Sequence, residues 1–218
     1  MRRALFLVWL SLFACPVRAC ETALMLAVDV SGSIDPDEYL LQTSGLADAL
    51  ADPEIVSTLV AGKVSLALMH WSGDGYQRLS LPWFSMQSAA DVAGFASATR
   101  RIARPRNYTD TAIGDAIRFS IAQFADVSHC QRAVIDISGD GEENSGLTLA
   151  PARAEAAAAG VTINAIAIEI DGETTALSQY FRRFVITPDG FVVTARGVAD
   201  YPRAIQTKLQ REVIKPVY

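Results

Sequence analysis

The segment ALMLAVDVSGSID, residues 23–35, decides the fold. Its first part, LMLAV, is an uninterrupted apolar run, which is typical of a strand buried on both faces in the centre of a parallel sheet. The run stops at Asp29, and Ser31 and Ser33 follow at every second position. After Ile34, the pair Asp35 and Pro36 forms a typical helix start. We therefore expect a central strand that ends in an oxygen-rich turn and leads into a helix.

Strand and helix patterns alternate along the rest of the chain. The turn residues at 73–75 and Pro82 predict that the strand after them runs antiparallel at the sheet edge. Alternating strands and helices predict an α/β fold, a doubly wound, mostly parallel central sheet flanked by helices with one antiparallel edge strand. Further strands are predicted at residues 63–71, 76–84, 132–137, 161–170 and 190–195, and helices at 36–50, 54–59, 88–102, 112–124, 149–159, 180–185 and 198–213.

Oxygen-bearing side chains occur at two further loops. Thr109 precedes the helix at 112–124, and Asp140 follows the strand at 132–137. Ligands of open α/β sheets bind at the carboxyl ends of the strands. Carboxylate and hydroxyl oxygens suit Mg²⁺, whereas zinc and copper favour the imidazole and thiolate groups that are missing from these loops. The alternative is a turn rich in serine and aspartate that only caps a helix.

Together these loops resemble the von Willebrand factor type A (VWA) domain and its metal-ion-dependent adhesion site (MIDAS). DVSGS at 29–33 matches the first element of that site, TDT at 109–111 the second, and GDG around Asp140 the third; Gly139 stands where many members of the family carry Thr or Ser. The resemblance implies that the metal ligands are Asp29, Ser31, Ser33, Thr109 and Asp140. Both serines would bind directly, both aspartates mainly through water, and Thr109 in either way. It also implies Mg²⁺, with Mn²⁺ as the alternative, and a protein partner that completes the coordination with a Glu or Asp carboxylate.

The first 19 residues have the pattern of a secretory signal peptide. A basic start and a short apolar core lead to a cleavage pattern ending at Ala19, which leaves 20–218 as a single VWA-like domain. A lipoprotein signal is the competing interpretation, with Cys20 as the lipidation site and Cys15 as a weaker candidate. No other apolar run reaches 18 residues, so we expect no stable membrane span in the mature chain. The expected location is periplasmic or secreted.

The charge balance disfavours a nucleic-acid partner. Cleavage would remove three of the 19 basic residues and none of the 24 acidic ones, which takes the net charge from −5 to −8. The local basic run is expected to be a solvated helix end, with attraction of an acidic partner as the alternative; it consists of Arg100, Arg101, Arg104 and Arg106.

Cys20 and Cys130 are predicted to form a disulfide. They lie nine and ten residues before Asp29 and Asp140, so they would come within reach of each other if the two strands are parallel neighbours. An exported chain permits that bond. Two unpaired thiols, or a lipid on Cys20, are the alternatives.

The sequence favours a binding module over an enzyme. His70 and His129 are expected to be structural, and neither a serine–histidine–aspartate pattern nor a G-x-S-x-G turn is present. Glu142, Glu143 and Asn144 are expected to form a solvated loop, with tuning of cation affinity as the alternative. Two other functions remain open. One is a structural domain whose metal ties loops together, and the other is a metal-assisted hydrolase that would use Glu142 or Glu143 as its base.

Overall fold

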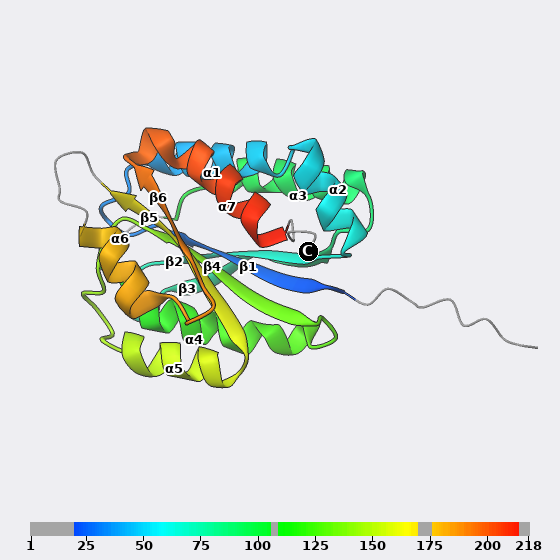
Figure 1. Cartoon of the computed structure of the whole chain (residues 1–218). Coiled ribbons are helices and arrows are strands. Elements are labelled where there is room, and N and C mark those ends of the chain that lie inside the picture. Colours follow the sequence, from blue (N-terminus) through cyan, green and yellow to red (C-terminus); the bar gives the residue numbers. More distant parts are fainter. Residues whose placement is uncertain (1–19, 106–108, 170–175, 214–218) are drawn as a thin grey trace, which may run out of the picture.

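The structure, a computed structural model, describes residues 20–105, 109–169 and 176–213. A six-stranded sheet is covered by helices on both faces (Figure 1), and its strands lie in the order β3-β2-β1-β4-β5-β6. All neighbouring strands are parallel except β3, which pairs antiparallel with β2 at one edge. The predicted fold class is therefore confirmed. The predicted signal peptide lies outside the described residues.

The elements follow the predicted order. The strands are β1 (Thr22–Asp29), β2 (Ser65–Trp71), β3 (Gln77–Ser85), β4 (Arg132–Gly139), β5 (Val161–Glu169) and β6 (Val192–Arg196). The helices are α1 (Pro36–Ala49), α2 (Pro53–Ala61), α3 (Ala89–Arg101), α4 (Ile113–Gln123), α5 (Leu149–Ala158), α6 (Ala176–Tyr180) and α7 (Tyr201–Val213), with short turns η1 (Phe124–Val127), η2 (Phe181–Val185) and η3 (Val198–Asp200). Helix α2 is longer than the predicted single turn, because Asp52 caps it and its apolar face buries Ile55 and Leu59.

Strand β1 is the centre of the molecule, as its apolar run predicts. Every residue of β1 is buried, and β2 and β4 flank it on its two sides. Leu24, Leu26 and Val28 belong to the core beneath the helix layer of α1, α2, α3 and α7, whereas Met25 and Ala27 point into the core on the opposite side, beneath α4 and α5. Figure 1 shows these two layers above and below the sheet. Both faces of the strand are thus covered, which explains the absence of polar alternation.

Helix α1 begins directly after the oxygen-rich turn. The Asp35 carboxylate accepts hydrogen bonds from the backbone N–H groups of Asp37 and Glu38, while Glu38 accepts one from the Asp35 backbone N–H. This reciprocal capping box satisfies N–H groups that have no partner within the helix. It fixes where α1 starts and so holds the end of the turn that precedes it.

Helix α7 lies across α1 and carries a buried charged group to the sheet. A Cβ on Gly45 of α1 would lie only 3.0 Å from Pro202 Cα of α7, so the two helices are in close contact. Lys208 is fully buried and forms ion pairs with Asp136 of β4 and with Glu212. One oxygen of each carboxylate, Asp136 Oδ2 and Glu212 Oε2, has no hydrogen-bond partner. We call Lys208, Asp136 and Glu212 the buried triad.

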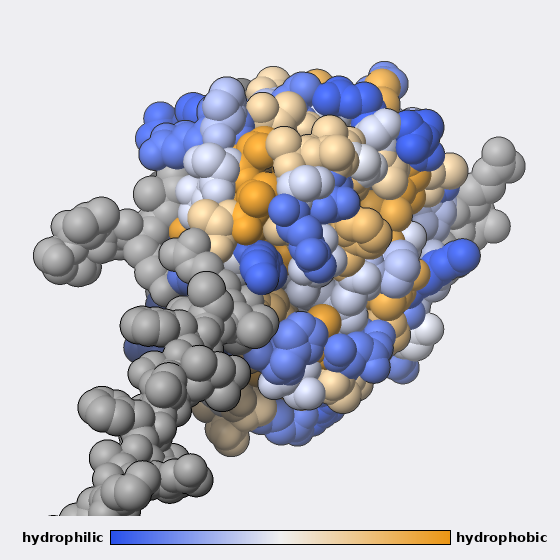
Figure 2. Space-filling view, turned by 90° about the vertical axis from the view of Figure 1, so that its right-hand side faces the viewer, coloured by the Kyte–Doolittle hydropathy of each residue, from blue (hydrophilic) through white to orange (hydrophobic). Residues whose placement is uncertain are grey.

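The amino ends of the strands carry the predicted disulfide. Thr22 pairs with Arg132 across β1 and β4, which places Cys20 beside Cys130, and the two are joined with their Cα atoms 4.5 Å apart. Figure 2 views the molecule from the end at which β1 begins and shows apolar residues there among hydrophilic ones. The disulfide and the predicted metal loops therefore lie at opposite ends of the sheet.

Candidate functional site

Four of the five predicted ligand residues meet at the carboxyl ends of β1 and β4. Ser31 Oγ lies 3.2 Å from Ser33 Oγ, and Ser33 Oγ donates a 2.8 Å hydrogen bond to Asp140 Oδ1. The Ser31 backbone N–H donates to Asp29 Oδ1 at 2.7 Å. Two adjacent strands thus bring Asp29 and Asp140, which are 111 residues apart in sequence, to one point with two serine hydroxyls.

Asp29 is the fully buried carboxylate of this group. Its Oδ2 has no hydrogen-bond partner. Burial, and then the negative charge of Asp140, raise the pKa of Asp29 to about 7, although the Ser31 hydrogen bonds act in the opposite direction. The Asp140 backbone N–H also attracts the carboxylate, without reaching hydrogen-bond geometry to Oδ2. A buried carboxylate oxygen without a partner is costly, and a bound cation would remove that cost.

A steric constraint explains why glycine stands at position 139, directly before Asp140. A Cβ on Gly139 would lie 3.2 Å from Asp29 Oδ2 and 3.4 Å from Trp71 Cζ2. The fully buried indole of Trp71 therefore occupies the space beside Gly139, where a larger residue would crowd the Asp29 carboxylate. The departure from the usual family residue leaves the candidate ligands in place.

Arg104 supports the oxygen-rich turn from outside. Its guanidinium donates hydrogen bonds to the backbone carbonyls of Ser31 and Ile34. The prediction that this arginine belongs to a solvated helix end is therefore wrong. Its backbone partners lie 70 and 73 residues earlier in the chain, so no local pattern could indicate them.

Thr109 lies on the adjacent segment, which leads into α4. Its side chain is exposed, and the segment is held in place through its neighbours. Ser72 Oγ donates to the Asp110 carbonyl at 2.9 Å, and the Ala112 backbone N–H donates to the Ser72 carbonyl at 2.9 Å. The end of β2 therefore fixes the segment that carries the fifth predicted ligand.

His70 occupies a structural position, as predicted, whereas His129 is exposed. His70 is buried in β2 between two hydroxyls, with Nε2 3.1 Å from Tyr39 Oη and Nδ1 2.8 Å from Ser80 Oγ. Burial lowers the pKa of His70 to about 4, so the ring is neutral at physiological pH. His129 lies beside the disulfide at the far end of the sheet. These are the only two histidines of the chain.

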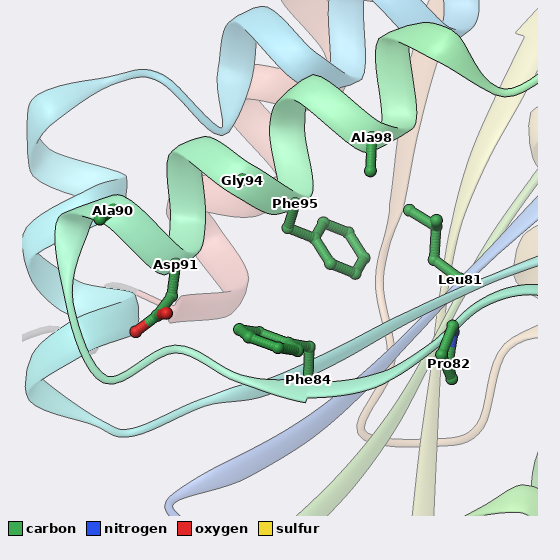
Figure 3. Close-up of a pocket in the computed structure, with 8 residues that line it drawn as sticks. All are labelled: Leu81, Pro82, Phe84, Ala90, Asp91, Gly94, Phe95 and Ala98. Atoms are coloured by element: carbon green, nitrogen blue, oxygen red, sulfur yellow. The ribbon is translucent and has the colours of Figure 1, made fainter.

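A groove of about 430 Å³ between β3 and α3 is separate from this site (Figure 3). Leu81, Pro82 and Phe84 approach it from β3, and Phe95 faces them from α3. None of the predicted ligands lines this groove. Among the helices that the structure describes, none combines the length and apolar character that crossing a membrane requires.

Comparison with known proteins identifies solved structures with a similar fold. No curated protein matches the chain. Proximal thread matrix protein 1 from the mussel byssus, in a structure with a zinc-occupied MIDAS motif, is 17% identical with a TM-score of 0.64, and the match covers 89% of this chain and 46% of that one. A von Willebrand factor type A protein from Catenulispora acidiphila is 19% identical with a TM-score of 0.62, over 90% of this chain and 44% of that one.

A third structure is similar over its own full length. BatB from Bacteroides thetaiotaomicron is 16% identical with a TM-score of 0.58, and the match covers 87% of this chain and 98% of that one. The chain spans less than half the length of the mussel and Catenulispora proteins. At these identities the likeness establishes the fold, which is that of a VWA domain. Over residues 19–217 the chain matches the family described as "Protein of unknown function (DUF1194)", and it belongs to that family.

Proposed function

We propose that this protein is an exported, non-enzymatic VWA-type binding domain. In this proposal Asp29, Ser31, Ser33, Thr109 and Asp140 hold a divalent cation, Mg²⁺ or alternatively Mn²⁺. The cation then binds a Glu or Asp carboxylate of a protein partner. Two hydroxyls and two carboxylates suit a hard cation. The zinc-occupied MIDAS of the mussel protein supports divalent cation binding in this fold and adds Zn²⁺ to the ions worth testing.

Asp29 is the observation that carries the proposal. Its Oδ2 is buried without a partner, beside two serine hydroxyls and a second carboxylate that already lie within hydrogen-bond distance of one another. Two carboxylates in such proximity repel each other unless a proton or a cation lies between them. A divalent cation would neutralise both and leave a coordination position for an outside ligand.

The geometry disfavours a hydrolase. His70, in the strand next to β1, is buried with both ring nitrogens beside hydroxyls, and His129 lies at the far end of the sheet. Glu143, one of the two acids proposed as a base, accepts hydrogen bonds from two backbone N–H groups with its two oxygens. A general base must be free to take a proton from its substrate, so Glu143 is poorly suited.

Direct hydrogen bonds also disfavour a metal that only ties loops together. The loop after Asp140 is directly hydrogen-bonded to the segment that follows Thr109 through Asn144 and Ser145. A cation would therefore add little to loop order. Export is supported by the disulfide and by the sequence pattern of residues 1–19.

Calorimetric titration of the protein lacking residues 1–19 with Mg²⁺, Mn²⁺ and Zn²⁺ tests the cation. The natural chain should bind one equivalent, and Ser31→Ala and Asp140→Ala should each lose that binding. Asp126→Ala serves as the control, because Asp126 is an exposed acid of η1, outside the strand-end loops. Cation binding that survives in Asp140→Ala, or that is lost equally in Asp126→Ala, would contradict the proposed ligands.

A second experiment tests the partner's chemistry. With the cation present, a peptide library attached to beads should enrich sequences that contain Asp or Glu over matched sequences with Asn or Gln. The enrichment should disappear with a chelator and with Ser31→Ala. Enrichment that ignores the cation would contradict a metal-mediated interaction.

A further inference from the structure

Glu143 links the beginnings of two helices. Its Oε1 accepts a 2.8 Å hydrogen bond from the Gly114 backbone N–H in the first turn of α4, and its Oε2 accepts one of 3.0 Å from the Leu149 backbone N–H at the start of α5. Neither helix has a side-chain hydrogen bond from its own N-cap residue, Ala112 or Thr148. One carboxylate three residues after Asp140 therefore takes the place of two missing caps, where both helix dipoles favour a negative charge.

Asn144 continues this link to the segment that carries Thr109. Its Oδ1 accepts from the Thr111 backbone N–H at 2.9 Å, and its own backbone N–H donates to the Thr111 carbonyl at 3.0 Å. The backbone N–H and the carbonyl oxygen of Thr111 are thus both hydrogen-bonded to the loop that begins at Asp140. Asn144 is exposed, as the prediction of a solvated loop requires, whereas Glu143 is only partly exposed and both its oxygens accept backbone hydrogen bonds.

The two helix starts are in direct contact. A Cβ on Gly114 would lie 2.4 Å from Thr148 Oγ1 and 2.5 Å from the Leu149 backbone nitrogen. Thr148 Oγ1 also donates to Asp115 Oδ1 at 2.8 Å. Only glycine at position 114 permits this close contact. The relative position of the two helix starts therefore depends on the side chain that bridges them, which is Glu143.

We propose that Glu143 and Asn144, which we call the clamp, are positioning residues for the cation site. They set the position of Thr109 relative to Asp140 by bonding the backbone around Thr109 to the loop after Asp140. Neither residue is a ligand in this proposal. The inference rests on the proposed function, and it extends that function to residues that no ligand motif includes.

Cation affinity of clamp variants tests the inference, with Mg²⁺ or Mn²⁺ alone as the probe and the temperature well below unfolding. Glu143→Gln keeps the size of the side chain but has one acceptor for two donors. We expect its affinity to fall by about tenfold or more, as for other residues that orient metal ligands. Glu142→Gln removes the same charge from the adjacent exposed residue. It should stay within about threefold of the natural chain, as expected for a solvent-exposed charge.

Asn144 provides a rescue pair. Asn144→Ala loses the acceptor for the Thr111 N–H and should weaken binding by about tenfold, whereas Asn144→Asp keeps that acceptor and should restore most of the affinity. Hydrogen exchange of the Gly114, Leu149 and Thr111 amides gives a readout without metal. These amides should exchange faster in the weakened variants.

The outcomes separate the clamp from the proposed function. Equal losses in Glu142→Gln and Glu143→Gln would indicate a charge effect and overturn the clamp. Natural affinity in Glu143→Gln and Asn144→Ala, despite faster amide exchange or lower stability, would make these residues structural only and would also overturn it. Absence of cation binding by the natural chain would overturn the proposed function itself, and the positioning role with it.

Discussion

Asp29 shows at the scale of one residue how the fold and the proposed site are connected. It is the last residue of the central strand, and the same burial that makes β1 a core strand removes its carboxylate from water. The pKa of Asp29 is consequently raised to about 7. In the folded, metal-free protein the charged form is disfavoured, whereas in the unfolded chain an aspartate ionises near its ordinary value of about 3.9.

The metal-free Asp29→Asn variant should therefore be more stable than the natural chain at pH 8. The folded natural chain holds its Asp29 proton more tightly than the unfolded chain does, so its stability falls as pH rises from about 4 to about 7. We expect an advantage for Asn of about 2–4 kcal/mol at pH 8 that shrinks by more than half at pH 5. Urea unfolding in the presence of a chelator measures it.

The matched variant is Asp37→Asn, at an exposed position in the first turn of α1. Its effect should be small, because the position is exposed. A pH-independent difference between Asp29→Asn and the natural chain would contradict the raised pKa of Asp29.

The candidate ligands could be predicted from sequence because their spacing follows a motif. Arg104 and Glu143 could not, because their partners are backbone groups that only the folded chain brings near. For Glu143 a weak signal was present. The helix predicted at residue 112 starts with Ala112, which cannot cap it, so another residue had to supply the cap.

At the scale of an element, α7 is attached to the sheet by charge as well as by apolar contacts. Ile205 and Leu209 pack in the core, and Lys208 reaches Asp136 between them. The buried triad contains two carboxylates and one ammonium group. Burial, and then the charge of Glu212, raise the pKa of Asp136, which Lys208 counteracts. The position of α7 therefore depends on Lys208.

Lys208→Met should destabilise the protein by about 3–5 kcal/mol, because it leaves two carboxylates buried together. The loss should be larger at pH 8 than at pH 5, since protonation in the folded state relieves the repulsion. Circular dichroism during urea unfolding at both pH values measures the change.

Arg211→Met is the control on the same helix. Arg211 stacks 3.9 Å from the centre of the Phe191 ring outside the buried triad, so its loss should cost no more than about 1 kcal/mol. Equal effects of the two substitutions would show that the triad has no special role in holding α7.

The kind and order of the elements could be read from hydrophobic patterns, as α1, β4 and α7 illustrate. Their neighbours in the sheet could not. Periodicity reports which face of an element is buried, but it does not say which strand lies beside it. The disulfide prediction assumed one such neighbour pair, β1 and β4, and the sheet contains that pair. The groove between β3 and α3 could not be predicted, because Phe84 and Phe95 face each other only when the two elements pack.

At the scale of the whole molecule, the disulfide closes most of the described chain into one loop. It joins residues 110 positions apart, at the end of the sheet opposite to the candidate site. In the chain-entropy model a loop of this length contributes about 4–5 kcal/mol. The double variant Cys20→Ser/Cys130→Ser should therefore lose about 2–5 kcal/mol of unfolding free energy, while its cation affinity stays unchanged.

Thermal unfolding with and without a reductant measures this contribution. Reductant should lower the unfolding temperature of the natural chain to that of the double variant, and it should leave the double variant unaffected. A natural chain that is insensitive to reductant, with both thiols accessible to alkylation, would contradict the disulfide.

The bond between Cys20 and Cys130 also bears on the alternative that Cys20 carries a lipid. A cysteine sulfur in a disulfide has no remaining bond for a thioether, so one molecule cannot carry a lipid on Cys20 and keep this bridge. Any form anchored through that sulfur would have a reduced Cys130 and a less stable domain. The disulfide and lipidation of Cys20 are therefore mutually exclusive fates of the same sulfur.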